Sequence, residues 1–358
     1  MSLFDILHLV GGLYLFLFGM NVMGSALERS AGIISAFVDN VATVLMVAPV
    51  AIEICKKLKT NPVPFIISIA VSSNLQGAAT LVGDTTAIML GSALNMSFFD
   101  FIIYDGKPGM FFVVELGALF SACIVYFIFR KEKGSIPKSG KMTEVTDYVP
   151  TILLFGAIGL LIVASFLPFD MPDEINGIIC CTLLVIGLVY NYAKKKNLDA
   201  IMGPLKAIDL ETLGLLTGLF LMIGGITEQG VIDALAQLLA KLGAGNPFLM
   251  YTIIVWASVL ISAFIDNIPY VATMIPVIAG IAMEMGIDST VLYFGLLSGA
   301  TLGGNCTPIG ASANIAGIGI LRKEGHEVAN SDFFKIGIPF TMSAVIPAYI
   351  MLWILFGV

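Results

Sequence analysis

Long apolar stretches recur along the whole chain, separated by short polar turns or by clusters of basic residues. They cover residues 4–20, 109–129, 149–168, 175–192, 210–226, 247–265 and 336–357. Each is long enough to cross about 30 Å of hydrocarbon as an α-helix. Apolar and polar positions do not alternate as they do in β-strands. The pattern therefore predicts an all-α polytopic membrane protein.

Composition supports this class and excludes others. Of the 358 residues, 58% are hydrophobic and 12% are charged, whereas a soluble domain carries about 25% charged residues. The expected partner is the lipid bilayer of the cell (plasma) membrane, which the chain crosses many times, and not nucleic acid. The chain has only two histidines, His8 and His326, and no serine–histidine or metal-binding set. The sequence therefore predicts neither an enzyme nor a cofactor, apart from a coupling ion, Na⁺ or H⁺.

The distribution of basic residues predicts how the chain is threaded through the membrane. The positive-inside rule places the basic clusters at residues 56–59, 130–141, 194–196 and 322–323 in the cytoplasm. Two apolar stretches, 31–58 and 247–286, then begin and end on the same side. Each predicts a re-entrant helical hairpin, whose tip lies at a depth where protein or water must surround it. The tips fall at Asp39-Asn40 and Asp266-Asn267.

An internal repeat relates the two tips. SAFVDNVATVLMVAPV (35–50) and SAFIDNIPYVATMIPV (262–277) share eight identities at an offset of 227 residues, the separation of positions 39 and 266. NLQGAATLVGDTTA (74–87) and TLGGNCTPIGASAN (301–314) follow the same offset without a gap, which indicates a duplication. Because the first hairpin enters from the cytoplasm and the second from outside, the repeats are predicted to be inverted, as in secondary transporters.

The second motif of each repeat predicts an unwound helix with a binding site. Residues 74–86 and 301–314 place amide, hydroxyl and glycine residues inside otherwise apolar crossings, and Pro308 removes a backbone donor. A broken helix leaves carbonyl groups free to coordinate a cation and N–H groups free to hold an anion. Hydroxyl and amide oxygens complete a shell that suits a hard cation such as Na⁺.

Acidic residues at this depth require an explanation. An acid in the middle of a membrane costs about 2.5–3.5 kcal/mol, so Asp39, Asp84 and Asp266 are candidates for Na⁺ ligands or proton carriers. The alternative for Asp39 and Asp266 is a helix cap at a hairpin turn. Glycine and threonine in membrane helices are also often packing residues. Glu115 lies mid-segment without a repeat partner, and structural and functional roles are equally open for it.

These motifs, together with NPVPF (61–65) and GGNCTPIGASANIAGIGI (303–320), resemble the arsenite permeases and the sodium/proton antiporters. Both families belong to an ion-transporter superfamily with the citrate transporters and the divalent-anion:sodium symporters. The resemblance covers residues 33–358. It implies a scaffold and a transport domain in each protomer, elevator-type alternating access and a homodimer.

The resemblance also implies which residues bind substrate and ions. They are Asp39, Asn40, Asn74, Gly77, Thr80, Gly83, Asp84 and Thr85 in the first half, and Asp266, Asn267, Gly304, Asn305, Thr307, Gly310, Ser312 and Asn314 in the second. Na⁺ is expected at Asp39, Asn40, Asn74, Asp266, Asn267 and Asn305. Arsenite permeases carry GDPPN where this chain reads GDTTA (83–87), a version closer to the sodium/proton antiporters.

The beginning of the chain departs from the repeat. GGLYLFLFGMNVMGSALERSAG (11–32) resembles the opening of the sodium/phosphate cotransporters, so residues 1–32 are expected to form a transmembrane helix of atypical origin. Residues 33–130 are expected to form a shortened first repeat with a hairpin, a broken helix and a scaffold helix. A cytoplasmic linker (131–148) and the second repeat with its scaffold helices (149–358) follow.

The sequence thus predicts a secondary active transporter, a permease that moves an inorganic ion or a small anion by symport or antiport with Na⁺ or H⁺. Its fold is expected to contain inverted repeats with two re-entrant helical hairpins and two unwound transmembrane helices. The short first repeat leaves one alternative open, a truncated or fused membrane protein of the same family that transports nothing.

Overall fold

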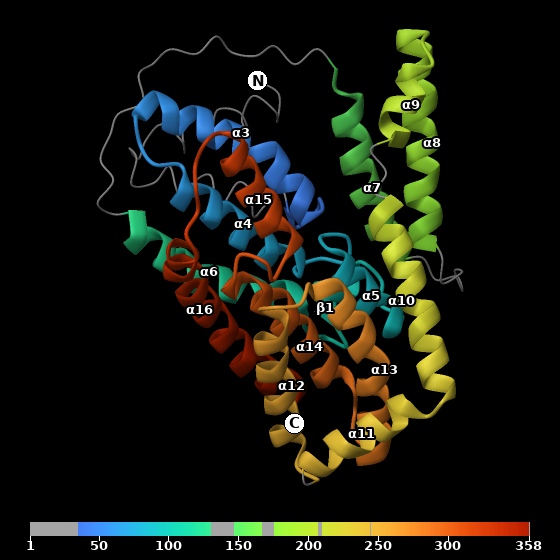
Figure 1. Ribbon diagram of the computed structural model, residues 1–358. Helices are drawn as coiled ribbons and strands as arrows, with labels where there is room; N and C mark the ends of the chain where they lie inside the picture. Colours follow the sequence, from blue (N-terminus) through green and yellow to red (C-terminus); the bar gives the residue numbers. More distant parts are fainter. Residues whose placement is uncertain (1–34, 130–146, 167–174, 207–209, 244, 358) are drawn as a thin grey trace.

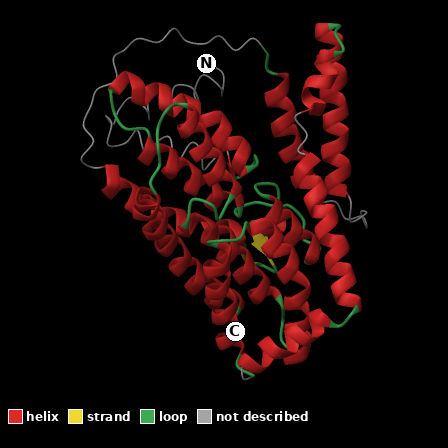
Figure 2. Ribbon diagram, in the orientation of Figure 1, coloured by secondary structure: helices red, strands yellow, loops and turns green. Residues whose placement is uncertain are grey.

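Helices make up nearly all of the described chain (Figures 1 and 2). The computed structural model describes residues 35–129, 147–166, 175–206, 210–243 and 245–357. The first half contains α3 (Asn40–Leu58), α4 (Val63–Gly77), α5 (Thr85–Ala93), the 3-10 helix η1 (Phe99–Phe101), a two-residue antiparallel ladder of β1 (Ile103–Tyr104) and β2 (Lys107–Pro108), and α6 (Met110–Phe129). The second half contains α7 (Val149–Phe166), α8 (Ile175–Lys195), α9 (Asp199–Lys206), α10 (Leu210–Glu228), α11 (Val231–Leu242), α12 (Pro247–Ser262), α13 (Asn267–Met285), α14 (Thr290–Gly303), the 3-10 helix η2 (Gly304–Cys306), α15 (Ser312–Lys323) and α16 (Asn330–Phe356).

The predicted helical membrane class is confirmed. Within the described residues, four helices are each long and apolar enough to cross a membrane, namely α6, α8, α13 and α16. α11 and α12 meet the same condition together, as a pair bent by 117°. α13 has the length of a full crossing, although the sequence predicts one arm of a re-entrant hairpin there. The stretch 4–20, the atypical start 1–32 and the linker up to residue 146 lie outside the described residues.

α3 and α13 occupy equivalent places in the repeat. Their first residues, 40 and 267, and their last residues, 58 and 285, are both 227 apart. Each helix ends at a residue with left-handed backbone angles, Lys59 at φ 57° and Gly286 at φ 64°. Only glycine adopts that conformation freely. Both repeats thus end this helix in the same backbone conformation, and glycine adopts it with less strain in the second repeat than lysine does in the first.

The two predicted helix breaks are present at equivalent positions. Residues 78–84 separate α4 from α5, and residues 307–311 separate η2, which continues α14, from α15. The last residue of each break is extended, Asp84 at φ −149° and Ala311 at φ −147°. Since these residues also lie 227 positions apart, the duplication seen in the sequence extends to the backbone.

Two groups of helices can be distinguished in Figure 1. α3 to α6 pack with α11 to α16, whereas α7, α8, α9 and α10 stand at one side, on the right of the view. α10 contacts the first group through α11 and α13. α6, which the sequence assigns to a scaffold, packs against α16 and α4 and so lies with the broken helices.

Large apolar side chains cover the outside of α7, α8 and α10. Ile152, Phe155, Val163, Val185, Val189, Leu221 and Met222 are all exposed. A soluble protein rarely exposes apolar patches of this extent. In a bilayer these side chains meet lipid, as the hydropathy of the segments predicts.

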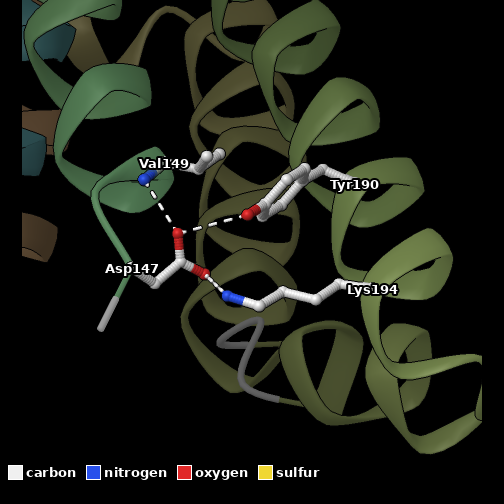
Figure 3. Close-up of polar contacts among 4 residues, drawn as sticks. All are labelled: Asp147, Val149, Tyr190 and Lys194. Atoms are coloured by element: carbon white, nitrogen blue, oxygen red, sulfur yellow. Dashed lines mark hydrogen bonds and ion pairs between the residues drawn. The ribbon is translucent and has the colours of Figure 1, made fainter.

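An ion pair connects the start of α7 to the end of α8 (Figure 3). Lys194 Nζ donates to Asp147 Oδ2 at 2.6 Å, while the Tyr190 hydroxyl and the Val149 N–H donate to Oδ1 at 3.3 and 3.0 Å. The hydrogen bond from Lys194 and then that from Val149 hold the pKa of Asp147 below its usual range. The contact therefore stabilises the α7–α8 hairpin while the carboxyl group is ionised.

Asp147→Asn is expected to lower the thermal midpoint at neutral pH, and the difference from the unchanged protein should vanish in acid. The folded-state pKa is depressed, so the stabilisation is full above the unfolded value of about 3.9 and is lost as the pH falls through the folded value. Thermal unfolding in detergent at a series of pH values measures this. Glu284→Gln, at an exposed carboxylate of α13, is the control. A difference that persists in acid would contradict the assignment.

Candidate functional site

Residues 35–39, at the tip of the first predicted hairpin, lie against the first helix break. The Thr80 hydroxyl donates a hydrogen bond to the carbonyl oxygen of Ala36 in the tip. Gly83 is enclosed by both segments, since a Cβ there would lie 2.7 Å from the carbonyl oxygen of Gly77 and 3.0 Å from that of Ala36. No side chain fits at that distance, so glycine is needed at position 83 for packing.

The second tip and the second break repeat this arrangement. The Thr307 hydroxyl donates to the carbonyl oxygen of Ala263. A Cβ on Gly310 would lie 2.7 Å from the carbonyl oxygen of Gly304 and 2.8 Å from that of Ala263. Every one of these residues lies 227 positions after its counterpart in the first half.

A serine at the start of each tip adds a further matched bond. Ser35 Oγ donates to the carbonyl oxygen of Ser73 at 2.8 Å, and Ser262 Oγ donates to that of Ala300 at 2.6 Å. All four groups are buried. Each tip is therefore fixed to its own broken helix by the same set of side-chain bonds.

Asn74 is the centre of a buried cluster of amides. Its Oδ1 accepts from Asn40 at 2.9 Å, and its Nδ2 donates to Asn305 at 2.8 Å and to Asn314 at 3.1 Å. Asn305 in turn donates to the carbonyl oxygen of Val71 at 2.9 Å. The four asparagine side chains are all buried. This amide cluster joins the first tip and the first broken helix to the second broken helix.

Asp84 is the centre of a second buried cluster. Its Oδ2 accepts from Asn267 at 3.2 Å and from the Thr86 hydroxyl at 2.7 Å, and Thr86 Oγ1 lies 3.3 Å from Thr301 Oγ1. Asp84 is only 3% exposed, so its hydrogen bonds come from protein groups rather than from bulk water. This acid cluster joins the second tip to the first break.

The aspartates that precede the tip asparagines cap helices. Asp39 Oδ1 accepts from the Val41 N–H at 3.0 Å, and Asp266 Oδ1 accepts from the Ile268 N–H at 3.1 Å. The alternative interpretation of these residues as caps is confirmed, and each begins a helix that follows a tip. Asp266 also reaches the second break, because its Oδ2 accepts from the Ser312 hydroxyl at 2.7 Å.

The predicted site residues thus meet in one region, in different roles. The amide cluster and the acid cluster hold Asn40, Asn74, Asn305, Asn314, Asp84 and Asn267. Gly83, Gly310, Thr80 and Thr307 hold the tips against the breaks. Gly77 and Gly304 pack within the breaks, against Asp84 and Gly310, while Thr85 begins α5 and is half-buried. Thr86 belongs to the polar run 74–86 but is not among the residues expected to bind, and Thr301 was missed. The signal was present for Thr301, which is the repeat counterpart of Asn74.

Basic side chains take no part in the two clusters. Within the described residues, no lysine, arginine or histidine forms an ion pair with Asp39, Asp84 or Asp266. The same part of the chain holds no group of three histidine, cysteine or acidic side chains close enough to bind a metal ion. A cation at this site would therefore rely on amide, hydroxyl and backbone oxygens beside single carboxyl groups, which suits Na⁺ better than a transition metal.

Known proteins with similar sequences include a membrane protein and several transporters. A family model described as citrate transporter matches residues 30–299. The 46 kDa membrane protein of Mycobacterium leprae is 32% identical over 324 residues, which cover 89% of this chain and 74% of that protein. An uncharacterized transporter of Mycobacterium tuberculosis is 30% identical over 322 residues, with the same coverage. The P protein of Homo sapiens is 28% identical over 385 residues, which cover 86% of this chain and 46% of the P protein.

The fold is also similar to that of a solved structure, the YdaH transporter of Alcanivorax borkumensis. The match has a TM-score of 0.63 and covers 93% of this chain and 78% of that chain. The two sequences are 15% identical in the matched region, so the likeness concerns the fold alone.

Thr80→Val and Thr307→Val are each expected to destabilise the protein by roughly 1–3 kcal/mol, because each leaves a buried carbonyl oxygen of the facing tip unpaired. The matched geometry predicts similar losses for the two variants. Thermal unfolding in detergent measures them. Thr273→Val is the control, since the Thr273 hydroxyl bonds a carbonyl within its own helix. A loss for one threonine and none for the other would contradict the equivalence of the two tips.

Proposed function

Because the chain belongs to the citrate transporter family, we propose that it is a secondary active transporter that moves a small ion together with Na⁺ or H⁺. Membership confirms the resemblance to the ion-transporter superfamily. The observation that carries the proposal is the meeting of two tips and two helix breaks at the amide and acid clusters. Polar, interrupted helices at such a meeting point are typical of substrate sites in secondary transporters.

A local two-fold relation between the halves supports alternating access. α6 and α16 touch where a Cβ on Gly117 would lie 3.1 Å from the carbonyl oxygen of Ala344, its counterpart 227 positions later. Elements that meet at equivalent residues surround a two-fold axis. With the opposite entry sides that the basic clusters predict, this axis lies in the plane of the membrane, as in transporters with inverted repeats.

The charge of the site favours a cation, or an anion that arrives with cations. Asp39, Asp84 and Asp266 bring carboxyl groups to one region, and no basic side chain in the described part of the chain pairs with them. A bare anion such as citrate would be repelled by them, and most strongly by Asp84, which alone of the three is buried. A cation bound by the amide and carboxyl oxygens neutralises this repulsion, so we assign the coupling ion to the two clusters.

The grouping of the helices supports an elevator-type movement. The helices that carry the two clusters pack together, and α7, α8 and α10 stand beside them with apolar outer surfaces (Figure 1). In the proposal the first group is the transport domain, and α7, α8 and α10 form the scaffold. The contacts of α10 with α11 and α13 are then the surface along which the transport domain slides. A homodimer formed through the scaffold helices is part of this proposal.

Reconstitution of the full chain in proteoliposomes tests the proposal. Labelled citrate or ²²Na⁺ is expected to accumulate when a Na⁺ or proton gradient is imposed. Asp84→Asn should lower this uptake roughly tenfold or more, because a buried hydrogen bond to a charged group contributes about 1.5–3 kcal/mol. The measurement is the initial rate of uptake at a fixed gradient.

Thr273→Val serves as the control again and should transport normally, since Thr273 bonds only within α13. Dicarboxylates and arsenite extend the substrate panel. Failure to move any of these ions in vesicles where a reference transporter works would overturn the proposed function. Equal uptake by Asp84→Asn and the unchanged protein would overturn the assignment of the acid cluster.

A further inference from the structure

Buried polar atoms without a hydrogen-bond partner gather along α4. Of the five in the described residues, Ser68 Oγ, Ser72 Oγ and Gln76 Oε1 lie on this helix at four-residue spacing. That spacing places them on one face, over about 12 Å of the helix axis. A fourth, Thr60 Oγ1, lies just before the helix. Because buried polar groups normally have partners, this row of oxygens is suited to bridging by water.

The row ends at Glu115 on α6. α4 packs against α6, and the Gln76 side chain lies beside the Glu115 carboxyl group, while the Gln76 Oε1 accepts no bond. Gln76 is 8% exposed, and Glu115 is half-buried two residues before Gly117, where α6 meets α16. A charged Glu115 carboxylate at this depth is costly, and protonation would neutralise it. The unused Gln76 Oε1 can accept a hydrogen bond from the protonated acid, so the two side chains can hold a proton.

The second repeat has no such row. The counterparts of Ser68, Ser72 and Gln76 are Gly295, Gly299 and Gly303. A Cβ on any of these glycines would lie 2.6–2.8 Å from an atom of α12, so close packing of α12 occupies that face. The counterpart of Glu115 is Met342. The polar row and its acid are therefore a feature added to one half of the duplicated frame.

Other charged groups do not account for Glu115. α4 carries no titratable residue. The titratable groups of α6 itself and of the elements packed against it are Cys123 and Tyr126 on α6, Lys107 on β2, and Asp332, Lys335 and Tyr349 on α16. Asp332 and Lys335 pair with each other at 3.4 Å, and Lys107 donates to a backbone carbonyl. No ion pair to Glu115 exists within the described ranges.

We propose that Glu115 and Gln76 form a proton-binding site, and that Thr60, Ser68 and Ser72 line its route from the start of α4. That end of α4 follows the basic cluster 56–59, on the side predicted to be cytoplasmic. The proton site is separate from the amide and acid clusters. Only its role in coupling rests on the proposed transport function.

The proton comes from water at the start of the row and binds a carboxylate oxygen of Glu115, which becomes a neutral carboxylic acid. Release returns the proton to water by the same route. In the acid form the Glu115 O–H donates to Gln76 Oε1, while the Gln76 N–H donates to the Glu115 carbonyl, so both buried groups are satisfied. Gln76 precedes Gly77, where α4 ends, so this change of partners acts directly at the first helix break.

Infrared difference spectroscopy of the full chain in lipid tests the site without any substrate. Titration from acid to alkaline pH is expected to reveal the carbonyl band of a protonated carboxylic acid. Glu115→Gln should remove the band, and Gln76→Leu should shift it to higher frequency because the hydrogen bond to the carbonyl is lost. Glu53→Gln, at an exposed acid of α3, should leave it unchanged. A band that survives Glu115→Gln, or that does not move in Gln76→Leu, overturns the proposal.

Exchange of the same band in heavy water tests the route. Ser72→Val should slow the hydrogen–deuterium exchange of the acid, because a methyl group replaces a polar group of the row. Ser298→Val is the matched control, since Ser298 is also buried without a partner but lies on α14. Equal exchange rates in the two variants would overturn the route along α4. Transport assays can fail independently of both results, so failure of the proposed function is distinguishable from failure of the proton site.

Discussion

A helix that breaks inside a membrane frees backbone carbonyl and N–H groups that lipid cannot satisfy. In this protein each break is held against a hairpin tip of the same repeat, and the Thr80 and Thr307 hydroxyls bond the backbone of the facing tips. Gly83 and Gly310 permit the approach, since a Cβ on either would lie 2.7 Å from a backbone oxygen. Tip and break therefore depend on each other, and the two buried clusters form only where both are in place.

The duplicated frame carries different chemistry in its two halves. Asn74 is matched by Thr301, and Asp84 is matched by Ala311. The first half therefore supplies the central residue of both clusters, and the second half closes them with Asn267, Asn305 and Asn314. The same asymmetry appears on α4, whose polar face corresponds to a row of glycines in the second repeat. Packing residues such as Thr80 and Thr307 or Gly83 and Gly310 are repeated, and so are the tip residues Asn40 and Asn267. Four other residues of the two clusters are not repeated, namely Asn74, Asp84, Asn305 and Asn314. This division is expected when a symmetric scaffold binds an asymmetric ligand.

The sequence was sufficient to predict the helical membrane class, the duplication and both helix breaks, because hydropathy and the offset of 227 are local patterns. It also singled out Asn40, Asn74 and Asp84, which the structure places in the two buried clusters, since polar groups in apolar segments are conspicuous. It did not show that Thr80 and Thr307 bond backbone carbonyl groups, or that α6 packs with the broken helices, because such contacts depend on three-dimensional packing. Gln76, in the polar run 74–86, and Glu115 were both noticed, but not as neighbours, since nothing in the spacing of residues 76 and 115 marks them as a pair. Occupation of the site by Na⁺ or substrate remains a prediction.

The most direct test of the central claim, that the two tips and two breaks form one cation site, is a diffraction experiment with thallium in place of Na⁺. We expect an anomalous peak beside the amide cluster or the acid cluster, within coordination distance of Asn74 or Asp84, with both tips closed against their breaks. A peak at any other place, or two tips separated from the breaks when the cation is bound, would contradict it.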